Sequence, residues 1–358
     1  MSGYQIPHFG LKRQYKNIGE ELIDATHRAL KDGQLVGGHY TRSFEEWLKH
    51  RTKTKYAITV HSGTQALEII ARYKKSTWVR PRGNLQEKPK VVIPNLTYPA
   101  TLNAFLNAGW DVTLGDTDKY GILSYSSQSV VGYNCLVGFA GKKPWEQARI
   151  ENSVNTIVDG AQHWLVAEGQ VGSGMAISFD PTKNLPSSGN GGAIVTNDEH
   201  LYLFAATYRD NNKPAFHDAG TNSKMSEQDC AQILVRAKYI DEWQKRRGEI
   251  AKYWCDAFRD LPLSCLSDTP TPHAHQKFVL YLEDRNSLHT HLLTDGIDSK
   301  IHYEYVLGDL PTSFGLTKPD MLSTSVMLSR GVISLPLYPE LTDQEVDYIA
   351  EKVIKFYE

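Results

Sequence analysis

The sequence contains no long apolar run and almost no net charge, and both absences limit what the protein can bind. No stretch of the 358 residues approaches the roughly 18 apolar residues in a row that indicate a membrane-spanning helix. The 39 Lys and Arg residues against 41 Asp and Glu residues leave a formal charge of −2, which gives no field that attracts polyanions. We therefore expect small molecules or proteins as partners, with no nucleic acid and no membrane.

Cysteine is also scarce. The four cysteines form no C-x-x-C pair and have no histidine beside them at metal-ligand spacing: Cys135, Cys230, Cys255 and Cys265. This spacing indicates neither a metal site nor a disulfide framework, and it favours a reducing compartment. The first eleven residues lack the charged and then apolar layout of a secretion signal, so we expect a cytoplasmic protein.

Short apolar strands alternate with helical patterns over the first two thirds of the chain. Strands are predicted at 56–60, 90–94, 110–114, 134–138, 155–159, 175–179 and 193–196. Helices are predicted at 18–30, around 44–48, after residue 63 and at 97–108. Such alternation predicts an α/β fold with a mostly parallel central sheet and helices on both faces.

The C-terminal third has a different pattern and predicts a second, smaller α+β domain. An amphipathic stretch over 226–258 would join the two parts, and we place the boundary between residues 245 and 246, giving domains 1–245 and 246–358. Inside the smaller domain we expect a strand at 276–282, a helix at 287–293, a turn and strand at 296–303, and a closing helix at 342–356.

Three segments at predicted strand ends carry polar groups suited to ligand binding. His61 to Thr64 leads from a strand into a helix, where free N–H groups favour a phosphate, although a plain helix cap explains the same residues. Asp159 ends a strand, where it could hold a ring nitrogen protonated, bind a ribose or cap the next helix. Lys183 follows another strand, and is either a solvated lysine or an amine that forms an imine with an aldehyde.

Taken together, these segments fit one cofactor. A phosphate cup, an acid 24 positions before a lysine (183 − 159) and the aromatic Tyr98 on a separate loop are the parts that hold pyridoxal 5′-phosphate. No metal is needed for such a site.

The chain resembles the DegT/DnrJ/StrS aminotransferases, a family of fold-type-I enzymes that depend on pyridoxal 5′-phosphate and mostly aminate keto-sugars attached to nucleotides. The resemblance covers nearly the whole chain and rests on the order of nine segments: 33–45, 62–67 (SGTQAL), 94–101 (PNLTYPAT), 158–162 (VDGAQ), 178–184 (SFDPTKN), 189–196 (GNGGAIVT), 220–225 (GTNSKM), 296–303 (GIDSKIHY) and 334–336.

This resemblance implies a role for each matching residue around the cofactor ring. Lys183 would form the imine with the cofactor and move a proton during transamination. Asp159 would pair with the pyridinium nitrogen, which keeps the ring an electron sink. Gln162 would bond to the phenolic oxygen, and Tyr98 would stack on the ring face.

The resemblance also assigns the phosphate, the subunit contact and the substrate. The phosphate would be bound by Gly63, Thr64 and Ser178. Asn222 would reach the phosphate in the neighbouring subunit's site, which implies a homodimer. The substrate would face His302 and Tyr303.

The implied activity is transfer of an amino group from glutamate, or glutamine, to a keto-sugar linked to a nucleotide. A lysine at position 183 argues against the dehydratases of the family, which have histidine there. The stretch from Glu304 to Gly308 departs from the family's usual proline and histidine. Two alternatives therefore stay open: an aminotransferase for a non-nucleotide ketone such as a keto-cyclitol, and a regulatory homologue that binds the cofactor without turnover.

Overall fold

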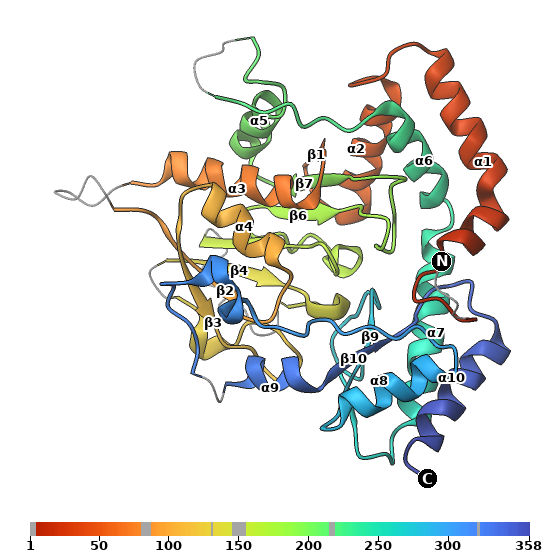
Figure 1. Cartoon of the computed structure of the whole chain (residues 1–358). Coiled ribbons are helices and arrows are strands. Elements are labelled where there is room, and N and C mark those ends of the chain that lie inside the picture. Colours follow the sequence, from red (N-terminus) through yellow and green to blue (C-terminus); the bar gives the residue numbers. More distant parts are fainter. Residues whose placement is uncertain (1–4, 80–86, 130–131, 145–154, 215–218, 321–322) are drawn as a thin grey trace.

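A seven-stranded sheet forms the centre of the larger part of the molecule (Figure 1). The computed structural model describes residues 5–79, 87–129, 132–144, 155–214, 219–320 and 323–358. The strand order is β1-β7-β6-β5-β4-β2-β3. The strands are β1 (Tyr56–Val60), β2 (Lys90–Pro94), β3 (Asp111–Gly115), β4 (Tyr133–Val137), β5 (Thr156–Asp159), β6 (Met175–Ser178) and β7 (Gly192–Thr196).

Most of this sheet is parallel, as the alternating pattern predicts. The pairs β2–β3, β2–β4, β4–β5 and β5–β6 are parallel, whereas β7 runs antiparallel to both of its neighbours, β1 and β6. All strands except β7 therefore point the same way. Their carboxyl ends meet at one edge of the sheet, which is where open α/β folds bind ligands.

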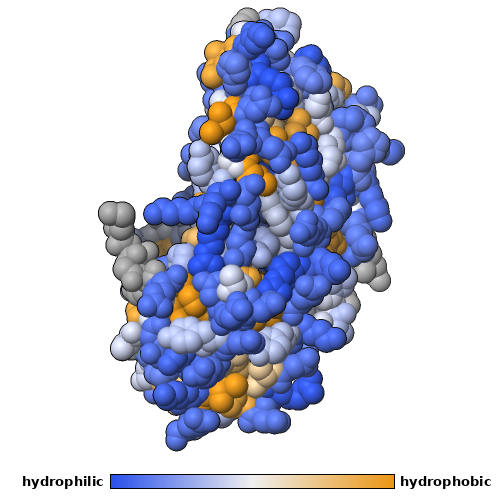
Figure 2. Space-filling model, turned by 90° about the vertical axis from the view of Figure 1, so that its right-hand side faces the viewer, coloured by the Kyte–Doolittle hydropathy of each residue, from blue (hydrophilic) through white to orange (hydrophobic). Residues whose placement is uncertain are grey.

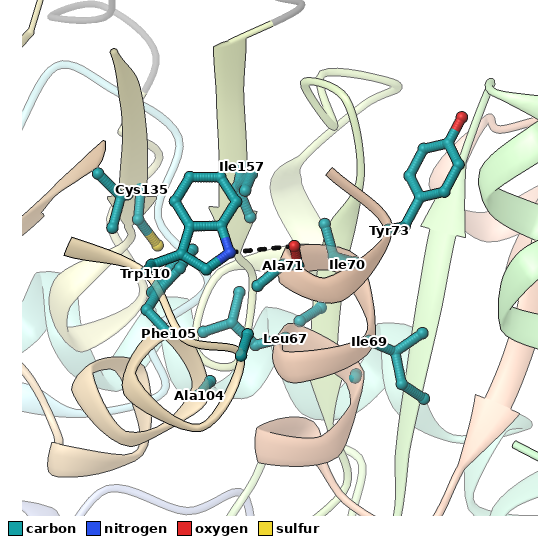
Figure 3. Close-up of a cluster of buried hydrophobic side chains, with 14 of the residues drawn as sticks. Leu67, Ile69, Ile70, Ala71, Tyr73, Ala104, Phe105, Trp110, Cys135 and Ile157 are labelled. Atoms are coloured by element: carbon teal, nitrogen blue, oxygen red, sulfur yellow. Dashed lines mark hydrogen bonds between the residues drawn. The ribbon is translucent and has the colours of Figure 1, made fainter. Parts of the chain in front are cut away.

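Helices cover both faces of the sheet and bury two apolar clusters. One cluster lies under α3 (Gly63–Thr77), α4 (Pro99–Asn107) and α5 (Glu199–Tyr208), and the other under α2 (His39–Thr52) and α6 (Glu227–Ala237). In the first cluster the indole N–H of Trp110 donates to the carbonyl of Ala71 over 3.1 Å, so its one polar atom is satisfied within the core (Figure 3).

The long N-terminal helix α1 (Leu11–Lys31) packs against α6 at the side of the molecule. The surface on this side is mainly hydrophilic with separate apolar patches (Figure 2). Leu11, Tyr15 and Ile23 keep 40%, 56% and 57% of their surface exposed. Because they recur at multiples of four residues, they lie along one face of α1.

A three-stranded antiparallel sheet and several helices make up the C-terminal part. Its strands are β8 (Ser264–Cys265), β9 (Phe278–Tyr281) and β10 (Val332–Leu335), and its helices are α7 (Ile240–Ala257), α8 (Arg285–Thr294), α9 (Thr324–Gly331) and α10 (Asp343–Lys355). A separate apolar cluster around Trp254, Phe258 and Phe278 fills this part. The position of the domain boundary stays a prediction, because α7 runs through residues 245 and 246 without a break and Ile6 packs into the C-terminal cluster.

Three sequence-based predictions need correction. The pattern over 226–258 forms two helices, α6 and α7, which are separated at Lys238 and Tyr239. The strand predicted within 296–303 is absent from this described segment, where Lys300 makes a single bridge to Ser334. The structure also joins Cys255 and Cys265 in a disulfide, because the turn after α7 brings β8 back beside that helix with the Cα atoms 6.0 Å apart.

Among the described residues, no helix combines the length and the apolar character that crossing a membrane requires.

Candidate active site

A cavity of about 530 Å³ lies at the carboxyl edge of the large sheet and collects the predicted site residues. It is lined by Gly63, Thr64, Tyr98, Asp159, Gln162, Ser178, Lys183, His302 and Tyr303, among others. The first seven come from the large sheet and its loops, and the last two from the C-terminal part. The site thus depends on the packing of the two parts against each other.

The first turn of α3 forms a cradle that suits a phosphate. Ser62 caps the helix by accepting a hydrogen bond from the N–H of Gln65 over 3.1 Å. The first-turn N–H groups of Gly63 and Thr64 have no partner within the helix, and the helix dipole favours an anion there. A Cβ at position 63 would lie 2.7 Å from the Cβ of Ser178, so glycine leaves the room that this close approach requires.

Asp159 is a buried carboxylate at the end of β5, with 8% of its surface exposed. Its Oδ2 accepts a hydrogen bond from the hydroxyl of Thr101 over 2.8 Å, and its Oδ1 accepts one from the N–H of Ala161 over 3.1 Å. Burial raises the pKa of Asp159, while these two hydrogen bonds and the charge of Lys183 oppose the rise. A carboxylate held in this way can pair with a cationic ring nitrogen in the cavity.

Lys183 extends from the loop after β6 into the same cavity. Its ammonium has no hydrogen-bond or ion-pair partner in the part of the chain that the structure describes. Desolvation lowers the pKa of Lys183, opposed by the charges of Asp159 and Asp180. A lysine with a lowered pKa is more often neutral, and the neutral amine is the form that attacks an aldehyde.

Gln162 connects the two sides of the cavity. Its Oε1 accepts a hydrogen bond from the N–H of Ala140 over 2.8 Å, and its Nε2 donates to the hydroxyl of Tyr303 over 3.1 Å. Tyr98 is 59% exposed, and its ring centroid lies 6.0 Å from that of Tyr303. The ring of His302 lies beside them, with its Nδ1 2.9 Å from the Oγ of Ser334.

Asn222 lies outside this cavity. Its side chain is exposed, and its backbone forms a bridge with Asp210 on the segment after α5. The described chain therefore does not bring Asn222 to its own candidate site. A role at the site of a second subunit stays a prediction.

Sequence reasoning missed several residues that line the cavity, among them Thr101 and Lys277. Thr101 lies in the quoted segment 94–101, but only the fold shows that its hydroxyl contacts Asp159. Lys277 lines the cavity beside Lys183, although it lies 94 positions later in the chain (277 − 183). No local pattern could have indicated Lys277, because its position depends on how the C-terminal part packs.

These features fit pyridoxal 5′-phosphate. The cradle at α3 matches its phosphate, Asp159 its ring nitrogen, and Lys183 its aldehyde. The fold and this donor set define a fold-type-I enzyme that depends on that cofactor.

The chain belongs to the DegT/DnrJ/EryC1/StrS aminotransferase family, whose model matches residues 16–126 and 160–354. It is an aminotransferase with pyridoxal 5′-phosphate as its cofactor, as the sequence predicts.

Several curated relatives match almost end to end. The chain is 26% identical to the dTDP-3-amino-3,4,6-trideoxy-alpha-D-glucose transaminase of Streptomyces venezuelae, over 94% of this chain and 92% of the relative. It is 24% identical to the dTDP-3-amino-3,6-dideoxy-alpha-D-galactopyranose transaminase of Aneurinibacillus thermoaerophilus, over 98% and 99%. A pleiotropic regulatory protein of Geobacillus stearothermophilus is 23% identical over 98% of each chain.

Solved structures agree with the fold. DesV of S. venezuelae, solved with a ketimine intermediate, superposes with a TM-score of 0.89 at 25% identity, covering 99% of this chain and 98% of that one. NtdA of Bacillus subtilis, solved with the cofactor PMP, gives a TM-score of 0.84 at 22% identity, covering 95% and 82%.

Proposed function

We propose that this aminotransferase transfers the amino group of glutamate, or glutamine, to a keto-sugar linked to a nucleotide. One observation carries the proposal: Lys183 and the buried Asp159 line one cavity beyond the phosphate cradle of α3. Relatives named as transaminases of dTDP-sugars, together with one named as a 3-aminotransferase of a UDP-N-acetyl sugar at 22% identity, support the substrate class.

The residues of the site have separate tasks in this proposed reaction. When bound, pyridoxal 5′-phosphate supplies an electron sink for the carbon next to the transferred nitrogen. The first turn of α3 and Ser178, which line the cavity, would hold its phosphate, and Asp159 would hold the proton on its ring nitrogen. The amine of Lys183 is placed to take the proton from one carbon and return it to the other.

The proposal includes a homodimer in which Asn222 contributes to the partner's phosphate site. The exposed position of Asn222 outside its own cavity supports this arrangement. The exposed apolar residues Leu11, Tyr15 and Ile23 on one face of α1 offer apolar surface to a second subunit.

A cytoplasmic location is also part of the proposal, and cell fractionation tests it.

The variant Lys183→Ala tests the chemistry directly. The wild-type protein should absorb at about 420 nm after loading with the cofactor, and the variant should lose this band together with turnover because it has no amine to bind the aldehyde. The exposed Lys238→Ala is the matched control, since Lys238 forms a surface ion pair with Glu21. Activity in Lys183→Ala equal to the wild type would refute the assignment.

The substrate class needs its own test. Keto-sugars linked to dTDP or UDP should turn over with glutamate, and the free nucleoside diphosphates should bind in calorimetry. Turnover of a free keto-cyclitol without binding of either diphosphate would overturn the nucleotide part of the proposal and leave the aminotransferase chemistry intact.

A further inference from the structure

Lys277 is a buried cation in the active-site cavity that none of the assigned roles uses. It directly precedes β9, is only 7% exposed and lines the cavity together with Lys183 and His302. Its backbone N–H donates to the carbonyl of Ala140 over 3.0 Å, which fixes its backbone beside the turn after β4. Among the described residues, its ammonium has no hydrogen-bond or ion-pair partner.

The charges around Lys277 leave its positive charge uncompensated. Burial lowers its pKa to about 7; the charges of Lys183 and Arg247 add to the lowering, and Asp180 opposes it. That one carboxylate already accepts hydrogen bonds from the N–H and the hydroxyl of Thr182, over 2.9 Å and 2.5 Å. Asp159 and Asp180 also line the cavity, but among the described residues neither carboxylate forms a hydrogen bond or an ion pair with the ammonium of Lys277.

Two histidines border the same region. His8 and His302 have ring centroids 5.5 Å apart, and burial and the charge of Lys277 lower the pKa of both. His8 donates from Nδ1 to the carbonyl of Asp298 over 2.9 Å. Both rings are therefore neutral near pH 7 and add no positive charge beside Lys277.

An anionic ligand would satisfy this ammonium, because a buried charge is stable only when it is paired. The position of Lys277 beside Lys183 selects among the possible anions. In an amino acid the α-carboxylate is attached to the carbon that carries the transferred nitrogen, so it must lie close to Lys183. In a nucleotide-linked sugar the diphosphate is separated from the reacting carbon by the sugar ring.

We propose that Lys277 binds the α-carboxylate of the amino-acid donor and so orients the donor for the first half of the reaction. This inference rests on the proposed function. The phosphate of the cofactor is a different ligand, since its cradle lies at α3 in the large part of the molecule, whereas Lys277 enters the cavity from the C-terminal part.

The variant Lys277→Gln tests the proposal with two donors that differ only at one group. L-glutamate has the α-carboxylate, and isoglutamine has an uncharged amide in its place. Conversion of the cofactor to its pyridoxamine form can be followed by absorbance without any sugar. We expect the half-saturating glutamate concentration to rise about 10- to 100-fold, the loss typical of a hydrogen bond to a charged group, and that for isoglutamine to change little. Lys277→Arg should retain most of the preference for glutamate.

Binding provides a readout that is independent of turnover. Calorimetry should show that glutarate, a dicarboxylate that has no keto group and therefore cannot react, binds the pyridoxamine form more weakly in Lys277→Gln than in the wild type. Wild-type affinity should fall as the pH rises above about 7, because Lys277 then loses its proton, and the variant should lack this dependence. The surface variant Lys238→Gln should match the wild type in both respects.

Three results would overturn the inference. Equal weakening of glutamate and isoglutamine would mean that Lys277 only supports the shape of the cavity. If Lys277→Gln left the glutamate kinetics unchanged but weakened inhibition by inorganic phosphate, Lys277 would bind a phosphate group and not the α-carboxylate. A wild-type enzyme that reacts with no amino-acid donor would overturn the proposed function as well, which distinguishes the two failures.

Discussion

At the scale of single residues, the proposed function requires that Asp159 stay ionised. Burial raises the pKa of its carboxyl group, and the hydrogen bonds from Thr101 and Ala161 oppose that rise. The carboxylate must stay ionised to hold a proton on a ring nitrogen. In the proposed function, the hydroxyl of Thr101 is therefore a positioning group that would act on the cofactor through Asp159.

Thr101→Val should move the acid limb of the pH profile to higher pH. The change removes a hydrogen bond to a charged group, worth about 1.5–3 kcal/mol, and keeps the side-chain shape. The pKa of Asp159 rises further, so the rate of glutamate-driven conversion falls at a higher pH as the medium is acidified. Measuring the conversion rate from about pH 5 to about pH 9 checks this prediction.

Thr196→Val is the matched control for this prediction. Its hydroxyl is also buried and donates to the carbonyl of Ser173 over 3.1 Å, but it lies at the opposite edge of the sheet because β7 is antiparallel. Coinciding acid limbs for Thr101→Val and Thr196→Val would contradict the role given to Thr101.

At the scale of elements, α2 depends on a residue far away in the chain. Its cap residue Gly38 provides no side chain, and the carboxylate of Glu227 at the start of α6 takes that place. This carboxylate accepts hydrogen bonds from the N–H groups of Gly38, Tyr40 and Thr41 over 2.8, 2.7 and 3.1 Å, and from the hydroxyl of Thr41. Glu227 is only 1% exposed, so it joins the N-terminal end of α2 to α6 within the interior.

Glu227→Gln should lower the free energy of unfolding by about 2–4 kcal/mol, because it removes a buried negative charge at a helix N-terminus. It also replaces one of the two oxygens that accept hydrogen bonds from backbone N–H groups with an NH2 group, which can only donate. Urea unfolding followed by circular dichroism measures this. Glu199→Gln, an exposed first-turn glutamate of α5, is the control and should change the stability by less than about 0.5 kcal/mol. Equal midpoints for the two variants would show that the buried carboxylate does not stabilise α2.

At the scale of the whole molecule, the proposed dimer makes a prediction about shared sites. If Asn222 acts in the partner's site, a mixed dimer of Lys183→Ala and Asn222→Ala subunits contains one site with both residues intact. Each variant alone should have low activity. Co-expression in equal amounts should restore about one quarter of the wild-type activity, since half of the dimers are mixed and half of their sites are intact.

The opposite arrangement gives a different result. If Asn222 served its own subunit, every site in the mixture would lack one of the two residues. Activity equal to the average of the two single variants, measured on dimers verified by light scattering, would therefore contradict the shared site.

The sequence determined the elements of the large sheet and, except for Asn222, predicted site residues that line one cavity. Strand β1 at 56–60 and strand β2 at 90–94 match their predicted ranges residue for residue, because a strand covered by helices on both faces of its sheet needs apolar side chains on both faces. Asp159 and Lys183 were predictable for a related reason. Asp159 ends β5 and Lys183 lies in the loop after β6, and the carboxyl ends of parallel strands meet at one edge.

Tertiary structure alone decided the rest. A continuous amphipathic pattern over 226–258 does not reveal the break between α6 and α7, since both helices keep their apolar faces on the core. The pairing of Cys255 with Cys265, the cap that Glu227 gives to α2, and the arrival of Lys277 beside Lys183 all join segments that no local periodicity connects. Local patterns record which face of an element is buried, but contacts between distant segments depend on how whole elements pack.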